Sequence, residues 1–220
     1  MITVEKLGKI VNTHDGQLEI LKNIDFTIEN GTSVAITGES GSGKSTLLSL
    51  LAGLDRSTSG KVIIDQQELG AMDEDQLAKF RANKVGFIFQ SFHLLGSLTA
   101  LENVMLPIEL KGIKDAKAEA QRLLDQVGLN HRLSHYPKQL SGGEQQRVAI
   151  ARAFATKPAI LFADEPTGNL DSKTGNNVAE LLFELNASHG TTLVLVTHDE
   201  KLAQTCANQI VLSAGMQVTE

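Results

Sequence analysis

Eight residues near the start of the chain, 38–45, have the sequence GESGSGKS and limit the possible folds more than any other segment. They match the pattern G-x-x-x-x-G-K-[ST], between a short strand-like run at 33–37 and a segment with a helical apolar stripe. That stripe consists of Leu47, Leu48, Leu51 and Leu54. Glycines let a backbone curl around phosphate oxygens, and the N–H groups of the next helical turn bind anions. Because a chance glycine-rich turn would not need both neighbours, the segment predicts a nucleotide phosphate-binding loop.

The ligands expected of this loop are ATP and Mg²⁺. Lys44 should reach the β- and γ-phosphates, and the hydroxyl of Ser45 should hold Mg²⁺. The residues expected to bind ATP are Gly38, Glu39, Ser40, Gly41, Ser42, Gly43, Lys44, Ser45 and Thr46.

The remaining sequence alternates between strand-like and helix-like segments. Residues 4–11 and 20–28 suit a half-buried antiparallel sheet, whereas the apolar runs at 159–163 and 192–196 suit strands covered on both faces. Between residues 91 and 157, helical periods replace extended runs. We therefore expect an α/β fold with a P-loop core, a mainly parallel sheet, an N-terminal antiparallel β subdomain and an inserted helical lobe. In this interpretation, residues 1–220 form one domain, with the core at 1–90 and 158–220 and the lobe at 91–157.

Composition excludes several classes of protein. The net charge of −6 argues against a protein that grips the phosphate backbone of nucleic acid. Cys206 is the only cysteine, so no internal disulfide is possible, and a buried position is expected for it. The sequence has neither a secretory signal nor a run of about 18 apolar residues. These features predict a cytoplasmic protein whose membrane role would come from a partner.

Two carboxylates, Asp164 and Glu165, follow directly after the apolar run at 160–163. Ligands bind at the carboxyl ends of parallel strands in open α/β sheets. Asp164 could support Mg²⁺ through water, and Glu165 could orient or deprotonate an attacking water. Both could instead be loop caps before Pro166, but a phosphate loop in the same chain favours the catalytic interpretation.

His198 follows another buried strand and falls at the same edge of the expected sheet. A lone histidine after a strand is more often a hydrogen-bonded structural residue than a catalytic one. At this edge, however, it could contact the γ-phosphate and position the water.

A second glycine-containing helix start lies at 140–147, with the sequence LSGGEQQR. Ser141 is a good N-cap and Glu144 could complete a capping box. Capping does not explain Gly142 and Gly143, because glycine lowers helix propensity. The segment is therefore a candidate for a second anion-binding site.

Taken together, these motifs resemble the ABC ATPase family over essentially the whole chain. The LSGGQ element of that family stands here as LSGGE. The matching elements follow in the family's order: the loop at 38–45, Gln90, residues 140–144, Asp164-Glu165, the turn at 169–171, and His198.

The resemblance implies a head-to-tail dimer with ATP held between two copies. Contacts to the ATP of the other copy would come from Ser141, Gly142, Gly143 and Glu144. Asp171 would lie at the dimer interface. The implied catalytic residues are Glu165 as base, His198 and Gln90, and the implied Mg²⁺ ligands are Ser45, Gln90 and, through water, Asp164.

One position departs from the family pattern. The family usually places an aromatic residue in the N-terminal sheet to stack on adenine, but residues 7–11 contain none. Val11 would offer only apolar contact to the base. The preference for ATP over GTP therefore stays open.

Residues 89–95 and 98–104 look like the branch that contains lipoprotein-releasing and macrolide-export ATPases. That branch implies a separate integral-membrane permease, a peripheral position on the cytoplasmic face of the inner membrane, and export or extraction of a hydrophobic or lipoprotein-like substrate. The alternative is a soluble ABC-type ATPase acting on nucleic acid or ribosomes, which the negative charge and single cassette disfavour. A P-loop GTPase or kinase is disfavoured by the LSGGE element.

Overall fold

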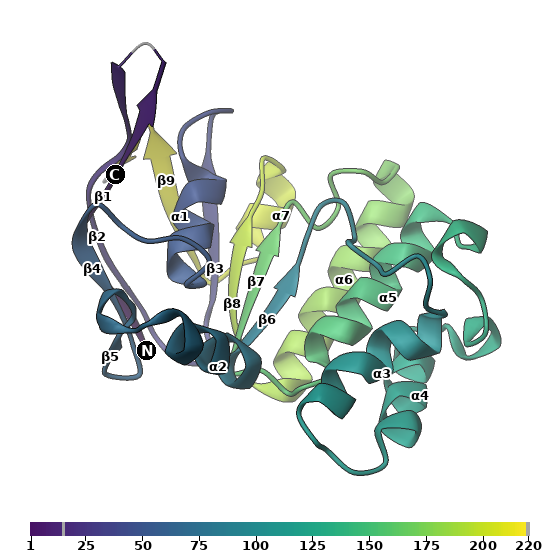
Figure 1. Cartoon of the computed structure of the whole chain (residues 1–220). Coiled ribbons are helices and arrows are strands. Elements are labelled where there is room, and N and C mark those ends of the chain that lie inside the picture. The colour runs from purple at the N-terminus through teal and green to yellow at the C-terminus, as the bar shows by residue number, and fades with distance from the viewer. Residues whose placement is uncertain (15, 219–220) are drawn as a thin grey trace. The chain divides into compact units, whose positions relative to one another are not determined.

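The chain is organised in two units (Figure 1). A computed structural model describes residues 1–14 and 16–218. The first unit comprises residues 1–81 and 192–220, and the second comprises residues 82–191.

An antiparallel sheet begins the first unit. Its strand order is β2-β1-β4-β5, with the bounds β1 (Ile2–Thr13), β2 (Gly16–Ile28), β4 (Ser59–Ile64) and β5 (Gln67–Glu68). Val4 pairs with Phe26 on one side and with Val62 on the other. Ile2, Val4 and Leu7 are buried. The antiparallel sheet expected from residues 4–11 and 20–28 is thereby confirmed.

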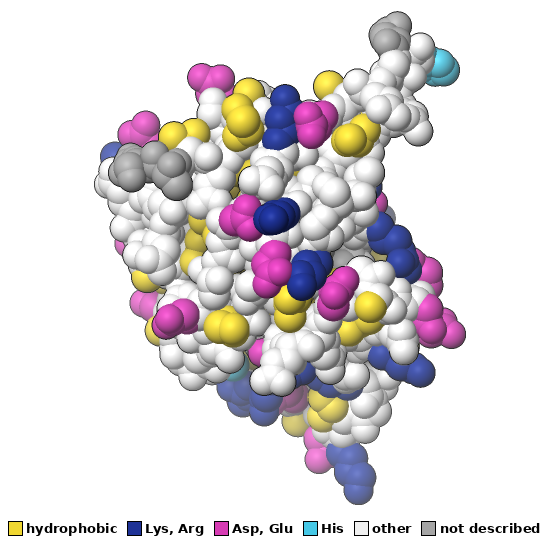
Figure 2. All heavy atoms as spheres, turned by 90° about the vertical axis from the view of Figure 1, so that its left-hand side faces the viewer, with side chains coloured by type: hydrophobic (Ala, Val, Ile, Leu, Met, Phe, Trp, Pro, Cys, Tyr) yellow, Lys and Arg dark blue, Asp and Glu magenta, His cyan; other side chains and the backbone are white. Residues whose placement is uncertain are grey.

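Charges of both signs are interspersed on the face of the molecule seen in Figure 2. In the antiparallel sheet, Lys61 pairs with Glu5 at 3.1 Å and Lys22 with Glu19 at 3.8 Å. Charges of opposite sign at this spacing partly cancel each other's field.

The first unit also contributes four neighbouring strands to a second sheet, in the order β10-β9-β3-β8. The strands are β3 (Ser33–Gly38), β8 (Thr192–Val196), β9 (Asn208–Ser213) and β10 (Met216–Val218), and the helices are α1 (Lys44–Leu51) and α7 (Glu200–Gln204). β3 runs parallel to both β8 and β9. Every residue of β8 is buried, as its continuous apolar sequence predicts. The prediction for Leu54 is wrong: α1 ends at Leu51, Gly53 adopts a left-handed φ of 64°, and Leu54 is half exposed.

Helices dominate the second unit. The parallel pair β6 (Val85–Ile88) and β7 (Ile160–Asp164) is accompanied by α3 (Ala100–Leu110), α4 (Ala116–Gln126), α5 (Gly142–Phe154) and α6 (Ser172–His189). Short 3₁₀ turns occupy Asn130–Arg132 and Pro137–Gln139. Phe154 and Phe162 are fully buried and are the largest such side chains in this unit. Gly190 ends α6 in the left-handed conformation, as glycine does at many helix C-termini.

Several short or weakly patterned elements were not predicted from the sequence. They include β5, α2 (Glu74–Lys84) with the 3₁₀ turn Leu69–Ala71 before it, α7 and β10. Only Leu77 and Phe80 of α2 are buried, so its apolar stripe is too short to stand out. In the part of the chain that the structure describes, no helix has the combination of length and hydropathy that crossing a membrane requires.

Candidate active site

The glycine-rich loop connects β3 to α1 in the first unit, and its close packing explains two of its glycines. Gly38 has a φ of 139°, and a Cβ there would lie 2.0 Å from the carbonyl oxygen of Leu212. Gly43 is the left-handed N-cap of α1, and a Cβ there would lie 2.8 Å from Cδ2 of Leu21. Neither position can hold a side chain without moving its neighbours. Gly41 is also left-handed, at a φ of 80°, but has open space around it.

Lys44 lies across this loop. Its Nζ donates to the carbonyl oxygens of Gly38 and Glu39, at 2.8 and 2.7 Å. Ser45 and Thr46 follow in the first turn of α1, and that turn presents backbone N–H groups without intrahelical partners. The Ser42 hydroxyl is buried and finds no hydrogen-bond partner among the described residues. The loop thus combines an ammonium group, helix-start N–H groups and an orphaned hydroxyl, which is the chemistry that binds phosphate.

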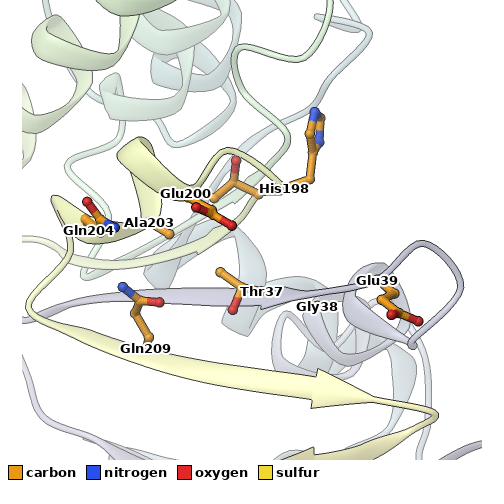
Figure 3. A pocket seen from close by; sticks show the side chains of 9 residues that line it. Thr37, Gly38, Glu39, His198, Glu200, Ala203, Gln204 and Gln209 are labelled. Atoms are coloured by element: carbon orange, nitrogen blue, oxygen red, sulfur yellow. The ribbon is translucent and has the colours of Figure 1, made fainter.

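His198 lines a pocket with the start of this loop (Figure 3). The pocket measures about 450 Å³ and is bounded by residues 37–39, residues 197–198, α7 and Gln209 of β9. His198 and Glu39 are both exposed. The first unit therefore brings His198 and the phosphate loop to one cavity, as their positions after parallel strands predict.

Val11 lies on β1, opposite Leu18 of β2. Cross-strand partners share one face of a sheet, and Leu18 is 54% exposed. The pair offers a small apolar surface but no aromatic ring, and neither residue lines the pocket beside His198.

Gln90 and Glu165 follow the neighbouring parallel strands of the second unit, where Ile88 pairs with Ala163. Asp164 ends β7, and Glu165 then takes the left-handed conformation at a φ of 47°. Asn169 donates to the carbonyl oxygen of Gln90 at 2.9 Å and accepts from its Nε2 at 3.4 Å. The turn after Glu165 is therefore tied to Gln90.

Gly168 lies close to the side chains of both Gln90 and Glu165. A Cβ on Gly168 would lie 3.1 Å from Nε2 of Gln90 and 3.4 Å from Cβ of Glu165. No role was predicted for Gly168 from the sequence, although it follows the acidic pair closely.

Ser141 begins α5 with a complete capping box. Its hydroxyl accepts from the N–H of Glu144 at 3.3 Å, and the carboxylate of Glu144 accepts from the Ser141 N–H at 2.8 Å. This confirms the predicted cap. A Cβ on Gly143 would lie 2.4 Å from Cγ2 of Thr174, so packing requires that glycine. A Cβ on Gly142 would meet Leu170 only at 3.4 Å, an ordinary contact, so packing does not explain Gly142.

Asp171 is the N-cap of α6, a role the sequence analysis missed. Its carboxylate accepts from the N–H of Thr174 at 3.1 Å. The side chain and backbone N–H of Thr174 lower the pKa of Asp171 below its usual value. Through Leu170 and Thr174, the second unit brings the turn at 169–171 against the start of α5.

Arg132 is a further residue that sequence analysis missed. Its Nε donates to Oε1 of Glu144 at 2.8 Å, while the other oxygen of Glu144 is held by Ser141. The hydrogen bonds from Ser141 and from Arg132 lower the pKa of Glu144 from 4.5 to about 2. No local pattern connects residues 12 positions apart, so only the fold reveals this pair.

Arg152 holds the segment after Gln90. Its guanidinium donates to the carbonyl oxygens of Phe92 and His93, at 2.8 and 2.6 Å. Both of these residues are left-handed, at φ of 59° and 50°. Burial lowers the pKa of Arg152. Such backbone strain persists only where surrounding contacts impose it.

The described residues include no group of three or more His, Cys, Asp or Glu side chains placed to hold a metal ion. Mg²⁺ is usually bound by one or two protein oxygens together with substrate phosphates. The Ser45 hydroxyl and the Asp164 carboxylate supply oxygens of that kind.

Comparison with known proteins identifies the family. The family model described as ABC transporter matches residues 21–168. The chain is 54% identical over 208 residues to the uncharacterized ABC transporter ATP-binding protein YbbA of Escherichia coli K12, covering 94% of this chain and 91% of that protein. It is 47% identical over 218 residues to the lipoprotein-releasing system ATP-binding protein LolD of Idiomarina loihiensis, covering 98% and 96%.

A solved structure gives the same result for the fold. The ATP-binding cassette MJ0796, in a dimeric post-hydrolysis state bound to ADP and Pi, superimposes with a TM-score of 0.92 at 42% identity, covering 100% of this chain and 97% of that one. The expected fold class, the P-loop α/β core with an antiparallel β subdomain and a helical region, is confirmed. The chain therefore belongs to the ABC transporter ATP-binding family, and it is an ATPase of that family.

Proposed function

We propose that this chain powers a bacterial transporter by hydrolysing Mg²⁺-ATP between two head-to-tail copies of itself. The observation that carries this proposal is Gly142, the first residue of α5, which follows the exposed N-cap Ser141. Packing leaves room there for a side chain, yet the residue is glycine. A backbone that must approach a ligand closely accounts for it, since the helix start presents N–H groups to an anion.

The chemistry follows from the residue types. Lys44 and the N–H groups of α1 would hold the β- and γ-phosphates, and Ser45 and Asp164 would hold Mg²⁺, which neutralises developing charge on the phosphates when bound. Glu165 would take the proton of the attacking water, with Gln90 and His198 orienting that water against the γ-phosphate. Ser141 and Gly142 of the second copy would complete the contacts to the triphosphate.

The partner would be a separate integral-membrane permease, with this chain held at the cytoplasmic face of the inner membrane. The support is the similarity to a lipoprotein-releasing system subunit and to YbbA. A hydrophobic or lipoprotein-like substrate fits the first of these relatives. The segment after Gln90, which Arg152 holds in a strained conformation, is the part of the chain that we assign to the permease contact.

Replacement of Glu165 tests the catalytic assignment. E165Q should bind ATP and lose about 10²–10⁴-fold in turnover, the usual contribution of a general base. E180Q, which changes an exposed glutamate of α6, is the matched control. Phosphate release is measured with each purified variant. Unchanged hydrolysis by E165Q would contradict the assignment of Glu165 as the catalytic base.

A gentle-detergent pull-down with this chain as bait tests the partner. We expect an integral-membrane permease to co-purify, and more of it with E165Q in the presence of ATP. Recovery of ribosomes or nucleic acid in its place would contradict the transporter assignment.

A further inference from the structure

The start of α5 carries a negative charge beside the serine proposed to meet ATP. Both oxygens of Glu144 are engaged: Oε2 accepts from the N–H and the hydroxyl of Ser141, each at 2.8 Å, and Oε1 accepts from Arg132. The side chain of Glu144 is only 14% exposed, and that of Arg132 is 35% exposed. The charge of Glu144 is thus largely shielded from water.

This arrangement conflicts with triphosphate binding in two ways. The Ser141 hydroxyl proton is directed to Glu144, so it is not available to a phosphate oxygen until that bond is exchanged. The carboxylate also repels a polyanion near the same helix start, and the repulsion is strong where water is scarce. A neutral glutamine at this position would remove the repulsion, and its uncharged amide oxygen would hold the Ser141 proton less strongly than a carboxylate does.

Arg132 is placed to reduce both the hold of Glu144 on the Ser141 proton and the repulsion between Glu144 and the triphosphate. Its guanidinium donates to the carboxylate oxygen on the far side from Ser141, so it neutralises the charge without occupying the serine. A positive partner draws electron density from the carboxylate and weakens its hold on the Ser141 proton. On its other side, Arg132 approaches Nε2 of His135 at 3.2 Å, so the guanidinium is fixed from two directions.

We propose that Arg132 is a positioning residue for ATP binding, compensating the charge of Glu144 so that Ser141 can donate to the triphosphate of the second copy. The proposal rests on the proposed function, because it needs Ser141 to meet ATP. If Arg132 acts by charge compensation, its removal weakens ATP binding only while Glu144 is charged. If Arg132 acts only by packing, its removal has the same effect whether or not Glu144 is charged.

The test is a double-mutant cycle measured in the E165Q background, where the proposed function predicts that the ATP-bound dimer accumulates. The concentration of ATP that gives half-maximal dimer is compared with and without R132M, first with Glu144 and then with E144Q in both arms. We expect R132M to raise that concentration about tenfold with Glu144, the effect of losing one charge-assisted interaction. With E144Q, we expect the same change to cost about twofold or less.

Two further variants control for folding and for net charge. R132K keeps the positive charge and should retain most of the affinity for ATP. R122M removes an arginine from the Arg122–Glu119 pair in the same unit, at 2.7 Å, and should leave the dimerisation curve unchanged.

The outcomes distinguish a failure of the proposed ATP-bound dimer from a failure of the role proposed for Arg132. If E165Q alone stays monomeric with ATP, the proposed function fails. If E165Q dimerises but R132M costs the same factor with Glu144 and with E144Q, the residue is structural and the inference about Arg132 is overturned on its own.

Discussion

At the scale of single residues, the carboxylate of Glu144 makes a direct link between pH and stability. Its folded-state pKa, about 2, lies below the ordinary value of 4.5. A depressed pKa contributes stability that is fully present above pH 4.5 and is lost as the pH falls towards 2. We expect E144Q to reduce the free energy of unfolding by about 1–2 kcal/mol at neutral pH, a modest value because Arg132 is partly exposed and the pair is screened.

Urea unfolding of wild type and E144Q at several pH values measures this difference. The gap between the two proteins should shrink as the pH falls below about 4.5, while unfolding of both becomes easier through other carboxylates. A gap that does not change with pH would contradict the ion pair as its source.

Val11 carries a second prediction at this scale. If the nucleotide base lies against β1 at this position, V11Y should add base stacking and tighten binding of both ATP and GTP. Stacking contributes about 1–3 kcal/mol per base, which corresponds to at least about fivefold in affinity. Fluorescent-nucleotide titration would show it, with L18Y on the neighbouring strand for comparison. No change in affinity for V11Y would mean that the base lies elsewhere.

At the scale of elements, Arg152 of α5 fixes the loop that follows β6. Two consecutive left-handed non-glycine residues are costly, and the guanidinium holds the carbonyls of both. R152M should lower the free energy of unfolding by about 1–3 kcal/mol, because it removes a half-buried charged donor from two carbonyl groups, of which that of Phe92 is partly buried. Hydrogen exchange should also rise in residues 91–95 ahead of the rest of the second unit. Uniform exchange across that unit would show that Arg152 stabilises α5 and not the loop.

The elements differ in how far their sequences predicted them. β7 and β8 have continuous apolar runs, and α5 has a capping box, so each was predicted from local chemistry. α7 has only five residues and β10 only three, which is too short for a period to develop. Leu54 matched the helical spacing of α1 but fell beyond Gly53, where the left-handed backbone ends the helix.

At the scale of the whole molecule, the candidate site is spread over segments far apart in the sequence. The motifs found in the sequence are short and local, and the structure places each at a strand end or a helix start. Arg132 and Arg152 were not predicted, because their contacts join residues 12 and about 60 positions apart. Long-range pairs of this kind leave no period or spacing in a single sequence, so they require a structure.

The central claim is that ATP joins two copies of this chain through the starts of α1 and α5. Light scattering of purified E165Q, with and without Mg²⁺-ATP, measures this directly. The account predicts that the molar mass doubles when ATP is added, and that S141R in the same background prevents doubling while ATP still binds. A protein that binds ATP at one site per chain and keeps the mass of a single chain would contradict it.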